Sequence, residues 1–350
     1  MKAMVLQKVG DFCLTDVEAP RPDAHEVLVE VRAAGICGSD ISRVYRTGAY
    51  SYPLIPGHEF SGVVVGVGEA VDCKWKGRRV GIFPLIPCKT CVPCQRKQYE
   101  LCKNYSYLGS RRDGGFAEYV TVPEGNLLEI PDSVSFEEAA MLEPMAVAVH
   151  AMRRLVLKET DNVVICGLGT IGILLWMFLR EAGIKHIFVI GNKEFQRKTL
   201  LRQGCQEKFF CDTRKEDVGK WVQRQTDGAG ADVFFECVGK NETFMQALEN
   251  TASGGKICLV GNPDADRYLS QALYWKILRN QLTITGTWNS SFTHSGADDW
   301  HYALARLSEK KIKPAELITH RFTLENLERG FHIMRDKTED YVKIMGIREN

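Results

Sequence analysis

Residues 162–191 read NVVICGLGTIGILLWMFLREAGIKHIFVIG, and this stretch decides the fold of the second half of the chain. The apolar run NVVIC is followed by the glycine-rich hexapeptide GLGTIG at 167–172, by an amphipathic stretch of helical length and by the apolar run HIFVIG. This order of strand, tight turn, helix and strand is typical of a βαβ unit in a parallel sheet. Further apolar runs at 231–239, 255–261 and 282–288 extend the pattern. We therefore expect a doubly wound parallel sheet, the Rossmann arrangement.

The glycine-rich hexapeptide also predicts a nucleotide site. Because Gly167, Gly169 and Gly172 carry no side chains, the backbone can approach a pyrophosphate, whose charge then meets free N–H groups at the positive helix end. The hexapeptide alone is a weak signal, but its place between a strand and a helix makes it specific. Together with Thr170 and Ile171, which open the predicted helix, these glycines are candidate contacts of NAD(P).

The strand after this helix ends without the acid that usually binds the ribose hydroxyls of NAD. Gly191 takes that place, followed by Asn192, Lys193 and, one helical turn later, Arg197. Loss of the carboxylate removes repulsion against a 2′-phosphate, and the two cations could bind one. NADP(H) is therefore slightly favoured over NAD(H). The alternative, that Lys193 and Arg197 belong to a solvated helix start beside Glu194, stays open.

Length and composition limit the class of protein. A chain of 350 residues suits two domains, and 45 basic against 44 acidic side chains leave no large field for nucleic acid or anionic lipid. The uncharged run 163–179 is short for a membrane span and is divided by glycines, so we expect none. The N-terminal MKAMVLQKVGDFCLTD resembles a first strand, which makes a cytoplasmic location the expectation. The twelve cysteines are then reduced thiols, some of them metal-bound.

A change of pattern along the chain predicts the domains. Short β-like runs such as FSGVVVGVG dominate the first part, and the βαβ pattern replaces them from about residue 162. After the last apolar run of that pattern, mixed helix and strand return. We expect a β-rich domain over 1–150, a nucleotide-binding domain over 151–288 and a return of 289–350 to the first domain.

Scattered residues of the first domain predict a catalytic metal. Cys37 stands in GICGSD, His58 and Glu59 in PGHEFSGVVVGVG, and Glu143 in MLEPMAVAVHA. A zinc ion that takes part in chemistry usually has three protein ligands and one open position. Cys37, His58 and one or both carboxylates satisfy this requirement. A lone cysteine or histidine can equally be a packed core residue, and spacing alone does not join these positions.

The segment CKTCVPCQRKQYELC at 88–102 contains four cysteines in close succession: Cys88, Cys91, Cys94 and Cys102. The last spacing does not match a ferredoxin cluster, and a dithiol redox site would need only two of the four. Four thiolates can surround zinc tetrahedrally and leave no position for a substrate. We expect a structural zinc in a lobe over 84–104.

The motifs together resemble those of the zinc-containing medium-chain alcohol and polyol dehydrogenases. CGSD, GHE followed by Gly62 and Gly68, the four-cysteine lobe, EP and GLGTIG occur in the order typical of that family and span essentially the whole chain. YLGSRRDGGFAEY, FPLIPCKTC and GTWNSSF are most similar to members that act on sugar alcohol phosphates. The resemblance implies an α/β protein with a GroES-like β-rich catalytic domain and a Rossmann coenzyme domain.

The resemblance also implies two zinc ions per subunit, one catalytic and one structural. Cys37, His58 and Glu143 would bind the catalytic ion, with Glu59 a direct or exchangeable ligand. The ion would lower the pKa of the carbinol group, which then gives hydride to the nicotinamide. Carboxylate ligands suit vicinal hydroxyls, in agreement with a polyol.

Ser39 matches the hydroxyl that passes the alcohol proton outward in this family. Many relatives carry a histidine three residues further on, where this chain has Ser42, so the last step of the relay stays open. Alternatively, the Ser39 side chain could cap a turn that follows a strand.

Arginine side chains are the candidates for a substrate phosphate, because bidentate guanidinium groups suit a dianion. Arg43, Arg111 and Arg112 are the three candidates, and at most one of the adjacent pair is expected to reach the site. Each of them could instead pair with a surface acid such as Asp113.

Coenzyme sites in parallel sheets lie beyond the carboxyl ends of the strands. We expect the nicotinamide beside residues at these ends and Trp288 near the substrate; the coenzyme candidates are Cys237, Val238, Val260, Gly261 and Thr287.

The expected function is hydride transfer between NAD(P) and a secondary alcohol of a sugar alcohol phosphate similar to galactitol 1-phosphate. A non-phosphorylated polyol such as sorbitol, xylitol or butanediol is the alternative substrate. A remote alternative is a non-enzymatic zinc- and nucleotide-binding regulator, against which the near-zero charge argues. The expected partners are the small-molecule substrate and further copies of the chain in a homodimer or homotetramer, with no nucleic acid and no membrane.

Overall fold

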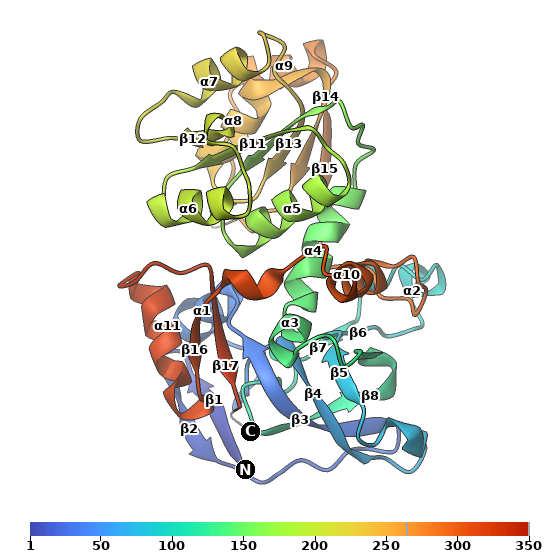
Figure 1. Cartoon of the computed structure of the whole chain (residues 1–350). Helices are drawn as coiled ribbons and strands as arrows, with labels where there is room; N and C mark the ends of the chain where they lie inside the picture. The colour runs from blue at the N-terminus through green and yellow to red at the C-terminus, as the bar shows by residue number, and fades with distance from the viewer. Residues whose placement is uncertain (264, 349–350) are drawn as a thin grey trace. The chain divides into compact units, whose positions relative to one another are not determined.

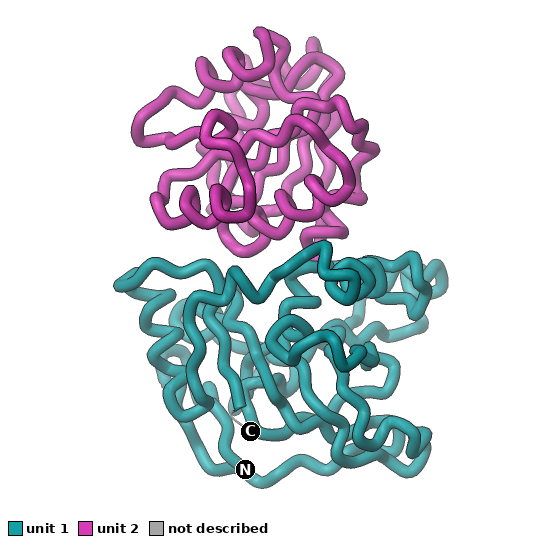
Figure 2. Tube along the Cα trace, in the orientation of Figure 1, with its two compact units in different colours: residues 1–146, 290–350 teal, residues 147–289 magenta. Residues whose placement is uncertain are grey.

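The computed structural model describes residues 1–263 and 265–348, which form two compact units (Figures 1 and 2). Unit 1 contains residues 1–146 and the described part of 290–350, and unit 2 contains the described part of 147–289. The division falls inside helix α4, Leu142–Arg153. The chain therefore leaves its first unit, completes the second and returns.

Unit 2 is a parallel sheet covered by helices. Within residues 147–263 and 265–289 the sheet has six strands in the order β12-β11-β10-β13-β14-β15. The strands are β10 Asn162–Cys166, β11 His186–Gly191, β12 Phe210–Asp212, β13 Ala231–Glu236, β14 Thr251–Leu259 and β15 Thr283–Gly286. The helices are α5 Thr170–Glu181, α6 Glu194–Arg202, α7 Val218–Gln225, α8 Asn241–Asn250 and α9 Gln271–Arg279, with the 3-10 turn η5 Glu207–Phe209. The order of strands changes direction between β10 and β13, where such sheets hold dinucleotides.

The apolar runs of the sequence form the interior of this sheet. Trp221 of α7, Leu248 of α8 and Leu273 of α9 pack with Val164 and Phe234 in one buried cluster on one face. Helix α5 lies against β10 and β11. Strand β12 was not predicted, because its three residues are too few to show a periodic pattern.

Unit 1 is built around a mixed, mainly antiparallel sheet. Within residues 1–146 and 290–348 it has seven strands, six in the order β16-β17-β3-β4-β5-β9 and β8 paired with β3. These strands are β3 Glu26–Gly35, β4 Glu59–Val67, β5 Arg79–Ile82, β8 Tyr119–Pro123, β9 Leu127–Glu129, β16 Ile318–Phe322 and β17 Lys343–Ile347. Two hairpin-like pairs accompany it: β1 Lys2–Lys8 with β2 Asp11–Asp16, and β6 Leu85–Ile86 with β7 Ser106–Tyr107.

Short helices connect the strands of unit 1. The α-helices are α1 Gly38–Ser42, α2 Val92–Gln95, α3 Phe136–Ala140, α10 Asp299–Ser308 and α11 Leu327–Asp336. The π-helix is η1 Arg43–Thr47, and the 3-10 turns are η2 Cys73–Trp75, η3 Tyr99–Leu101, η4 Glu124–Asn126, η6 Pro314–Leu317 and η7 Leu324–Asn326.

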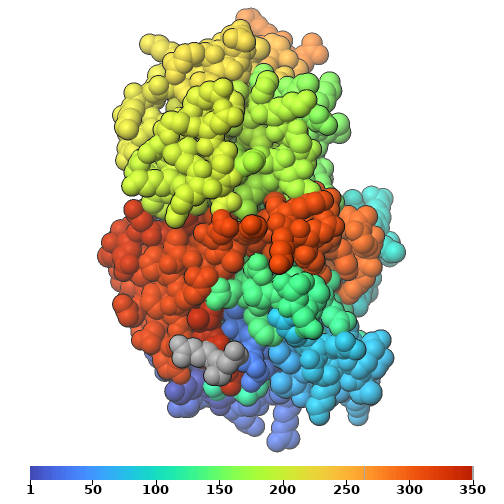
Figure 3. Space-filling view, in the orientation of Figure 1, coloured from blue at the N-terminus to red at the C-terminus, as the bar shows by residue number. Residues whose placement is uncertain are grey.

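The C-terminal residues complete the unit that the N-terminal residues begin. Strand β17 pairs antiparallel with β3, with Met345 opposite Gly35. Phe331 of α11 packs its ring against Phe12, with ring centroids 4.6 Å apart, and against Phe116, at 5.6 Å. In the space-filling view the red C-terminal residues of unit 1 lie directly beside its blue and green residues (Figure 3). Among the described residues, no helix has the length and apolar character needed to cross a bilayer.

Candidate active site

Three of the predicted metal ligands come together in unit 1. Cys37 precedes α1, and His58 and Glu59 stand at the start of β4. A ligand atom from each lies within 4.8 Å of the other two, and His58 and Glu59 are buried. Thiolate, imidazole and carboxylate are ligand types of catalytic zinc, so this donor set fits that ion. Ser39 lies in α1, two residues after Cys37, and is half-buried.

The Asp40 carboxylate connects several groups of this site. Its buried carboxylate accepts hydrogen bonds from Arg43 Nη1 at 2.9 Å and from the Cys37 backbone N–H at 3.0 Å, and lies 3.4 Å from His58 Nδ1. Burial alone would raise the pKa of Asp40, but the His58 and Arg43 charges outweigh it and lower that pKa. Burial would likewise lower the pKa of His58, and Asp40 raises it well above its usual value. Arg43, a predicted substrate residue, is engaged in this buried pair.

Lys343 of β17 pairs with Glu59, and both side chains are only 3% exposed. The Lys343 Nζ donates to Glu59 Oε2 and, at 3.0 Å, to the Ile36 carbonyl. Burial would lower the pKa of Lys343, but the charge of Glu59 overcomes this and raises it. Lys343 was not predicted from the sequence, because 284 residues separate it from Glu59.

Glu143 lies in the first turn of α4 and is buried beside this group. Its Oε1 accepts a hydrogen bond from the Tyr107 hydroxyl at 3.3 Å, and the Tyr107 ring meets the His58 ring edge-on at 5.8 Å. Burial raises the pKa of Glu143 to about 7, although the charge of His58 lowers it. A divalent cation here would stabilise the charged carboxylates. Tyr107 is a second residue of the site that was not predicted from the sequence.

Arg112 lies in an ion pair rather than in an open site. Its Nη2 donates to Glu26 Oε1 at 2.7 Å and to Thr121 Oγ1 at 3.3 Å. The Glu26 side chain is 10% exposed, so this guanidinium is held by a nearly buried acid.

Arg111 lies in an aromatic setting. Its guanidinium carbon lies 4.4 Å from the ring centroids of both Tyr50 and Tyr105. The Tyr105 ring in turn meets the Tyr107 ring edge-on at 6.2 Å. A series of aromatic contacts therefore links Arg111 to Glu143 and His58.

The four-cysteine lobe has the dimensions of a zinc site. The Sγ–Sγ distances are 4.0 Å for Cys88–Cys94, 3.5 Å for Cys91–Cys94 and 3.9 Å for Cys91–Cys102. A tetrahedral zinc about 2.3 Å from each sulfur would require separations of about 3.8 Å. Hydrogen bonds from Thr90 lower the pKa of Cys88 to about 5, which favours the thiolate that binds metal. The geometry fits a structural zinc.

The glycine-rich loop of unit 2 has the close contacts expected of a pyrophosphate cradle. Gly167 has a φ of +99°, and a Cβ on Gly172 would collide with the Gly167 carbonyl. At Gly169, which caps α5, an added Cβ would meet no atom within 4 Å, so the loop is open there. Thr170 and Ile171 form the first turn of α5, and the N-terminus of a helix suits a phosphate.

The remaining coenzyme candidates lie at the carboxyl ends of β13, β14 and β15. The N–H groups of Val260 and Gly261 both donate to the Glu236 carbonyl, at 2.8 and 2.9 Å. Among the described residues, the buried Thr287 Oγ1 has no hydrogen-bond partner, which leaves it open to a ligand. Cys237 and Val238 follow β13, and the half-exposed Trp288 follows β15.

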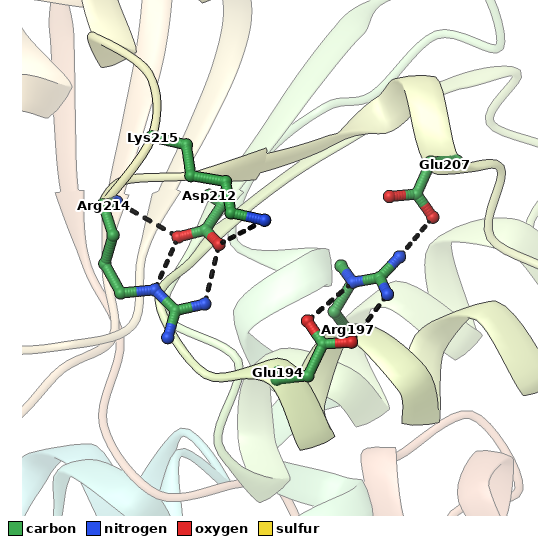
Figure 4. Close-up of polar contacts among 6 residues, drawn as sticks. All are labelled: Glu194, Arg197, Glu207, Asp212, Arg214 and Lys215. Atoms are coloured by element: carbon green, nitrogen blue, oxygen red, sulfur yellow. Dashed lines mark hydrogen bonds and ion pairs between the residues drawn. The ribbon is translucent and has the colours of Figure 1, made fainter.

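Gly191 ends β11, and Asn192 and Lys193 lead into α6. Arg197 of α6 is enclosed by acids, as Figure 4 shows: its Nε and Nη2 donate to Glu194 at 2.9 and 2.6 Å, and its Nη1 donates to Glu207. The predicted 2′-phosphate contact is therefore already balanced by two carboxylates.

Comparison with known families agrees with both units. Residues 23–132 match the family described as "Alcohol dehydrogenase GroES-like domain", and residues 170–309 match the family described as "Zinc-binding dehydrogenase". The chain belongs to the zinc-containing medium-chain alcohol and polyol dehydrogenase family. The predicted fold, a GroES-like domain with a Rossmann domain, is confirmed.

Individual relatives differ in substrate. Galactitol 1-phosphate 5-dehydrogenase of Escherichia coli K12 is 34% identical over 87% of this chain and 88% of its own. Sorbitol dehydrogenase of Halalkalibacterium halodurans is 30% identical over 99% of this chain and 98% of its own. L-threonine 3-dehydrogenase of Bacillus subtilis is 34% identical over 96% of this chain and 95% of its own.

Solved structures show the same fold with either coenzyme. Galactitol-1-phosphate dehydrogenase from Escherichia coli superposes with a TM-score of 0.92 and 31% identity, over 99% of this chain and 100% of the other. A zinc-binding dehydrogenase from Sinorhizobium meliloti bound to NADP has a TM-score of 0.89 and 29% identity, over 99% of both chains. A dehydrogenase from Escherichia coli CFT073 complexed with NADH has a TM-score of 0.90 and 27% identity, over 99% of both chains.

We expect about two zinc ions per chain, one at each cluster. Replacing Cys37 by Ser should remove about one ion and abolish turnover, because the buried donor set loses its thiolate. Inductively coupled plasma mass spectrometry on dialysed protein measures the ions. Cys13→Ser, at an exposed cysteine outside both clusters, should keep both. Full zinc content in Cys37→Ser would refute the assignment.

Replacing Lys343 by Met should destabilise the protein by about 3–5 kcal/mol, because it leaves the buried Glu59 carboxylate without its cation. Denaturant unfolding of metal-free protein measures this cost. The matched control is Lys2→Met, which breaks the exposed Lys2–Glu325 pair and should cost less than about 1 kcal/mol. Equal losses of unfolding free energy in the two variants would show that the buried Lys343–Glu59 pair contributes no more than an exposed ion pair.

Proposed function

We propose that the protein transfers hydride between NAD(P) and a secondary alcohol of a sugar alcohol phosphate, with galactitol 1-phosphate as the first substrate to test. The main supporting observation is that one unit contains both a buried zinc-type donor set, Cys37, His58 and Glu59, and a stacked arginine linked to it by aromatic contacts. The similarity to galactitol 1-phosphate 5-dehydrogenase adds support.

The residues of the site have separable roles in this proposal. When bound, zinc would supply Lewis-acid polarisation of the carbinol oxygen, and the nicotinamide would accept the hydride. Cys37, His58 and the carboxylates of Glu59 and Glu143 would hold the ion. Ser39, half-buried two residues after Cys37, would take the alcohol proton and pass it outward.

Arg111 is the phosphate receptor of this proposal. Among the described residues no carboxylate pairs with Arg111, whereas Arg43 pairs with Asp40 and Arg112 with Glu26. Stacking on two tyrosines and a hydrogen bond from Nη1 to the Tyr105 carbonyl at 3.3 Å hold the planar guanidinium in place, and its remaining N–H donors could bind an anion.

A non-phosphorylated polyol is the second candidate substrate. It is supported by the sorbitol dehydrogenase relative, which matches 99% of the chain. For the coenzyme, NADP(H) is slightly favoured, because Gly191 puts no carboxylate at the end of β11. A reducing, cytoplasmic location suits the twelve cysteines, all of them in the described residues and none in a disulfide.

We also propose a homodimer or homotetramer that assembles through unit 2. Strand β15 is an edge of the described sheet, and Ile284 on it is exposed. The preceding helix α9 exposes Tyr274, Trp275 and Leu278, each about half. Unpaired sheet edges and exposed apolar side chains are covered in stable proteins. A second copy of the chain can pair the same edge antiparallel with itself across a two-fold axis.

The substrate proposal predicts that Arg111→Gln raises the KM for galactitol 1-phosphate by about tenfold or more, since a charge-assisted hydrogen bond is lost. Rates on galactitol and sorbitol should not change. Initial-rate kinetics with NAD and NADP measure both effects. Arg78→Gln, which breaks an exposed pair with Glu129, is the control. Equal wild-type rates on galactitol 1-phosphate and galactitol would exclude the phosphate requirement.

The assembly proposal predicts that wild-type protein is at least dimeric and that the double variant Trp275→Arg, Leu278→Glu is monomeric. Charges on α9 would have to be buried in the interface, which is costly. Light scattering after size exclusion measures the mass. Val156→Glu places a negative charge, as Leu278→Glu does, at an exposed residue of unit 2 outside α9. This variant should leave the assembly intact. A monomeric wild type would contradict the proposal.

A further inference from the structure

We propose that Arg214, which follows β12, selects NADP(H) by binding its 2′-phosphate, and that Arg197 does not take this role. The inference rests on the proposed NAD(P)-dependent function and names the residue that distinguishes the two coenzymes. It differs from the sequence prediction, which placed this role on Lys193 and Arg197.

The position of Arg214 follows from the register of two neighbouring strands. Gly191, the last residue of β11, lies opposite Asp212, the last residue of β12, and the Thr213 N–H donates to the Gly191 carbonyl at 3.0 Å. The ribose of a dinucleotide lies at the end of the strand that follows the glycine-rich helix. The Arg214 side chain therefore starts close to the position expected for the ribose.

Asp212 orients Arg214 and leaves part of its guanidinium free. Arg214 Nε donates to Asp212 Oδ1 at 2.9 Å, and its Nη2 donates to Asp212 Oδ2 at 2.7 Å. A guanidinium has five N–H donors, so this pair uses one edge and leaves the Nη1 side to bind a second anion. Figure 4 shows Nη1 pointing away from Asp212. The Arg214 side chain is 52% exposed, which keeps that side accessible.

The charge balance around Arg214 favours an anion. Lys215 Nζ lies 3.8 Å from Asp212 Oδ2, so two cations share one carboxylate. Around Arg197 the balance is reversed, because Glu194 and Glu207 share one cation (Figure 4). The charge of Glu194 also acts on Arg214 and Lys215, but Arg197 is bonded to that carboxylate and offsets its charge. A phosphate dianion would therefore be attracted more strongly to the first group than to the second.

The packing of Gly191 bears on why a residue after β12, and not one at the end of β11, would contact the ribose. A Cβ on Gly191 would lie 2.7 Å from Leu168 Cδ1, a buried side chain of the glycine-rich loop. An acid at the end of β11 would therefore require the Leu168 side chain to shift. The neighbouring acid, Asp212, is already bonded to Arg214 and cannot accept freely from the ribose hydroxyls of NAD. Both features favour a phosphorylated ribose.

Binding of adenosine fragments to the full-length, zinc-loaded protein tests the proposal. Isothermal titration calorimetry compares 2′,5′-ADP with 5′-AMP, which differ only in the 2′-phosphate. We expect the wild type to prefer 2′,5′-ADP and Arg214→Gln to weaken that ligand about tenfold or more, with 5′-AMP near the wild-type value. Arg214→Lys, which keeps the charge but loses the planar fork, should give an intermediate loss.

Two further variants serve as comparisons. Arg197→Gln should keep the preference for 2′,5′-ADP, since two carboxylates already satisfy that guanidinium. Arg224→Gln breaks an exposed ion pair with Glu216 in the same unit and should change neither affinity. Thermal unfolding of each variant shows that it is folded, and the ratio of kcat/KM with NADP and NAD should follow the binding ratio.

The outcomes separate this inference from the function on which it rests. If the wild type prefers 2′,5′-ADP but Arg214→Gln keeps that preference, or Arg197→Gln abolishes it, the role of Arg214 is overturned and the NADP preference stands. If the wild type shows no preference, both the NADP preference and the role of Arg214 are overturned. Hydride transfer with NAD would still decide the proposed dehydrogenase function independently.

Discussion

The buried ion pair between Lys343 and Glu59 is the interaction on which the arrangement of the candidate metal site depends. Glu59 begins β4, and Lys343 begins β17, the C-terminal strand that pairs with β3 just before Cys37. The ammonium also bonds the Ile36 carbonyl, so one side chain joins the two backbone segments that carry the candidate ligands. The return of the chain to unit 1 therefore does more than complete a sheet, because it brings a positive charge into a site that is otherwise acidic.

The charges around that pair also explain why the site suits a cation. Asp40, Glu59 and Glu143 are all buried, and His58, Arg43 and Lys343 oppose them. The protein cations bind Asp40 and Glu59, whereas the hydrogen bond that Glu143 receives within the described residues comes from a tyrosine hydroxyl. Burial raises the pKa of Glu143 to about 7, although the charges of His58 and Lys343 lower it. A carboxylate that is costly to charge in isolation becomes favourable when a divalent ion neutralises it. The incomplete balance is therefore consistent with a metal ligand.

Local patterns predicted the parts of the molecule that neighbouring residues determine. The four cysteines from Cys88 could be recognised from their spacing, and the loop at Gly167 from its place between a strand and a helix. Lys343 and Tyr107 could not, because each acts through a partner from a distant segment. Asp212 could not, because its place beside Gly191 comes from the pairing of β12 with β11. Strand β12 was missed for a similar reason: three residues show no period, and the strand exists because β11 lies beside it. The arginines follow the same rule, since no sequence pattern distinguishes a paired guanidinium from an open one.

That distinction matters because the chain carries a formal charge of only +1 and has no large positive field to attract phosphates. Selectivity must then come from single arginines whose orientation is fixed before the ligand arrives. Arg111 is fixed by two tyrosine rings and a backbone carbonyl, and Arg214 by one carboxylate, and in both cases guanidinium N–H donors remain for a ligand. Arg43 and Arg112 are each paired with a buried acid, and Arg197 is paired with two acids. Whether an arginine in this protein binds an external phosphate is thus decided by what its neighbours leave unoccupied, not by its charge.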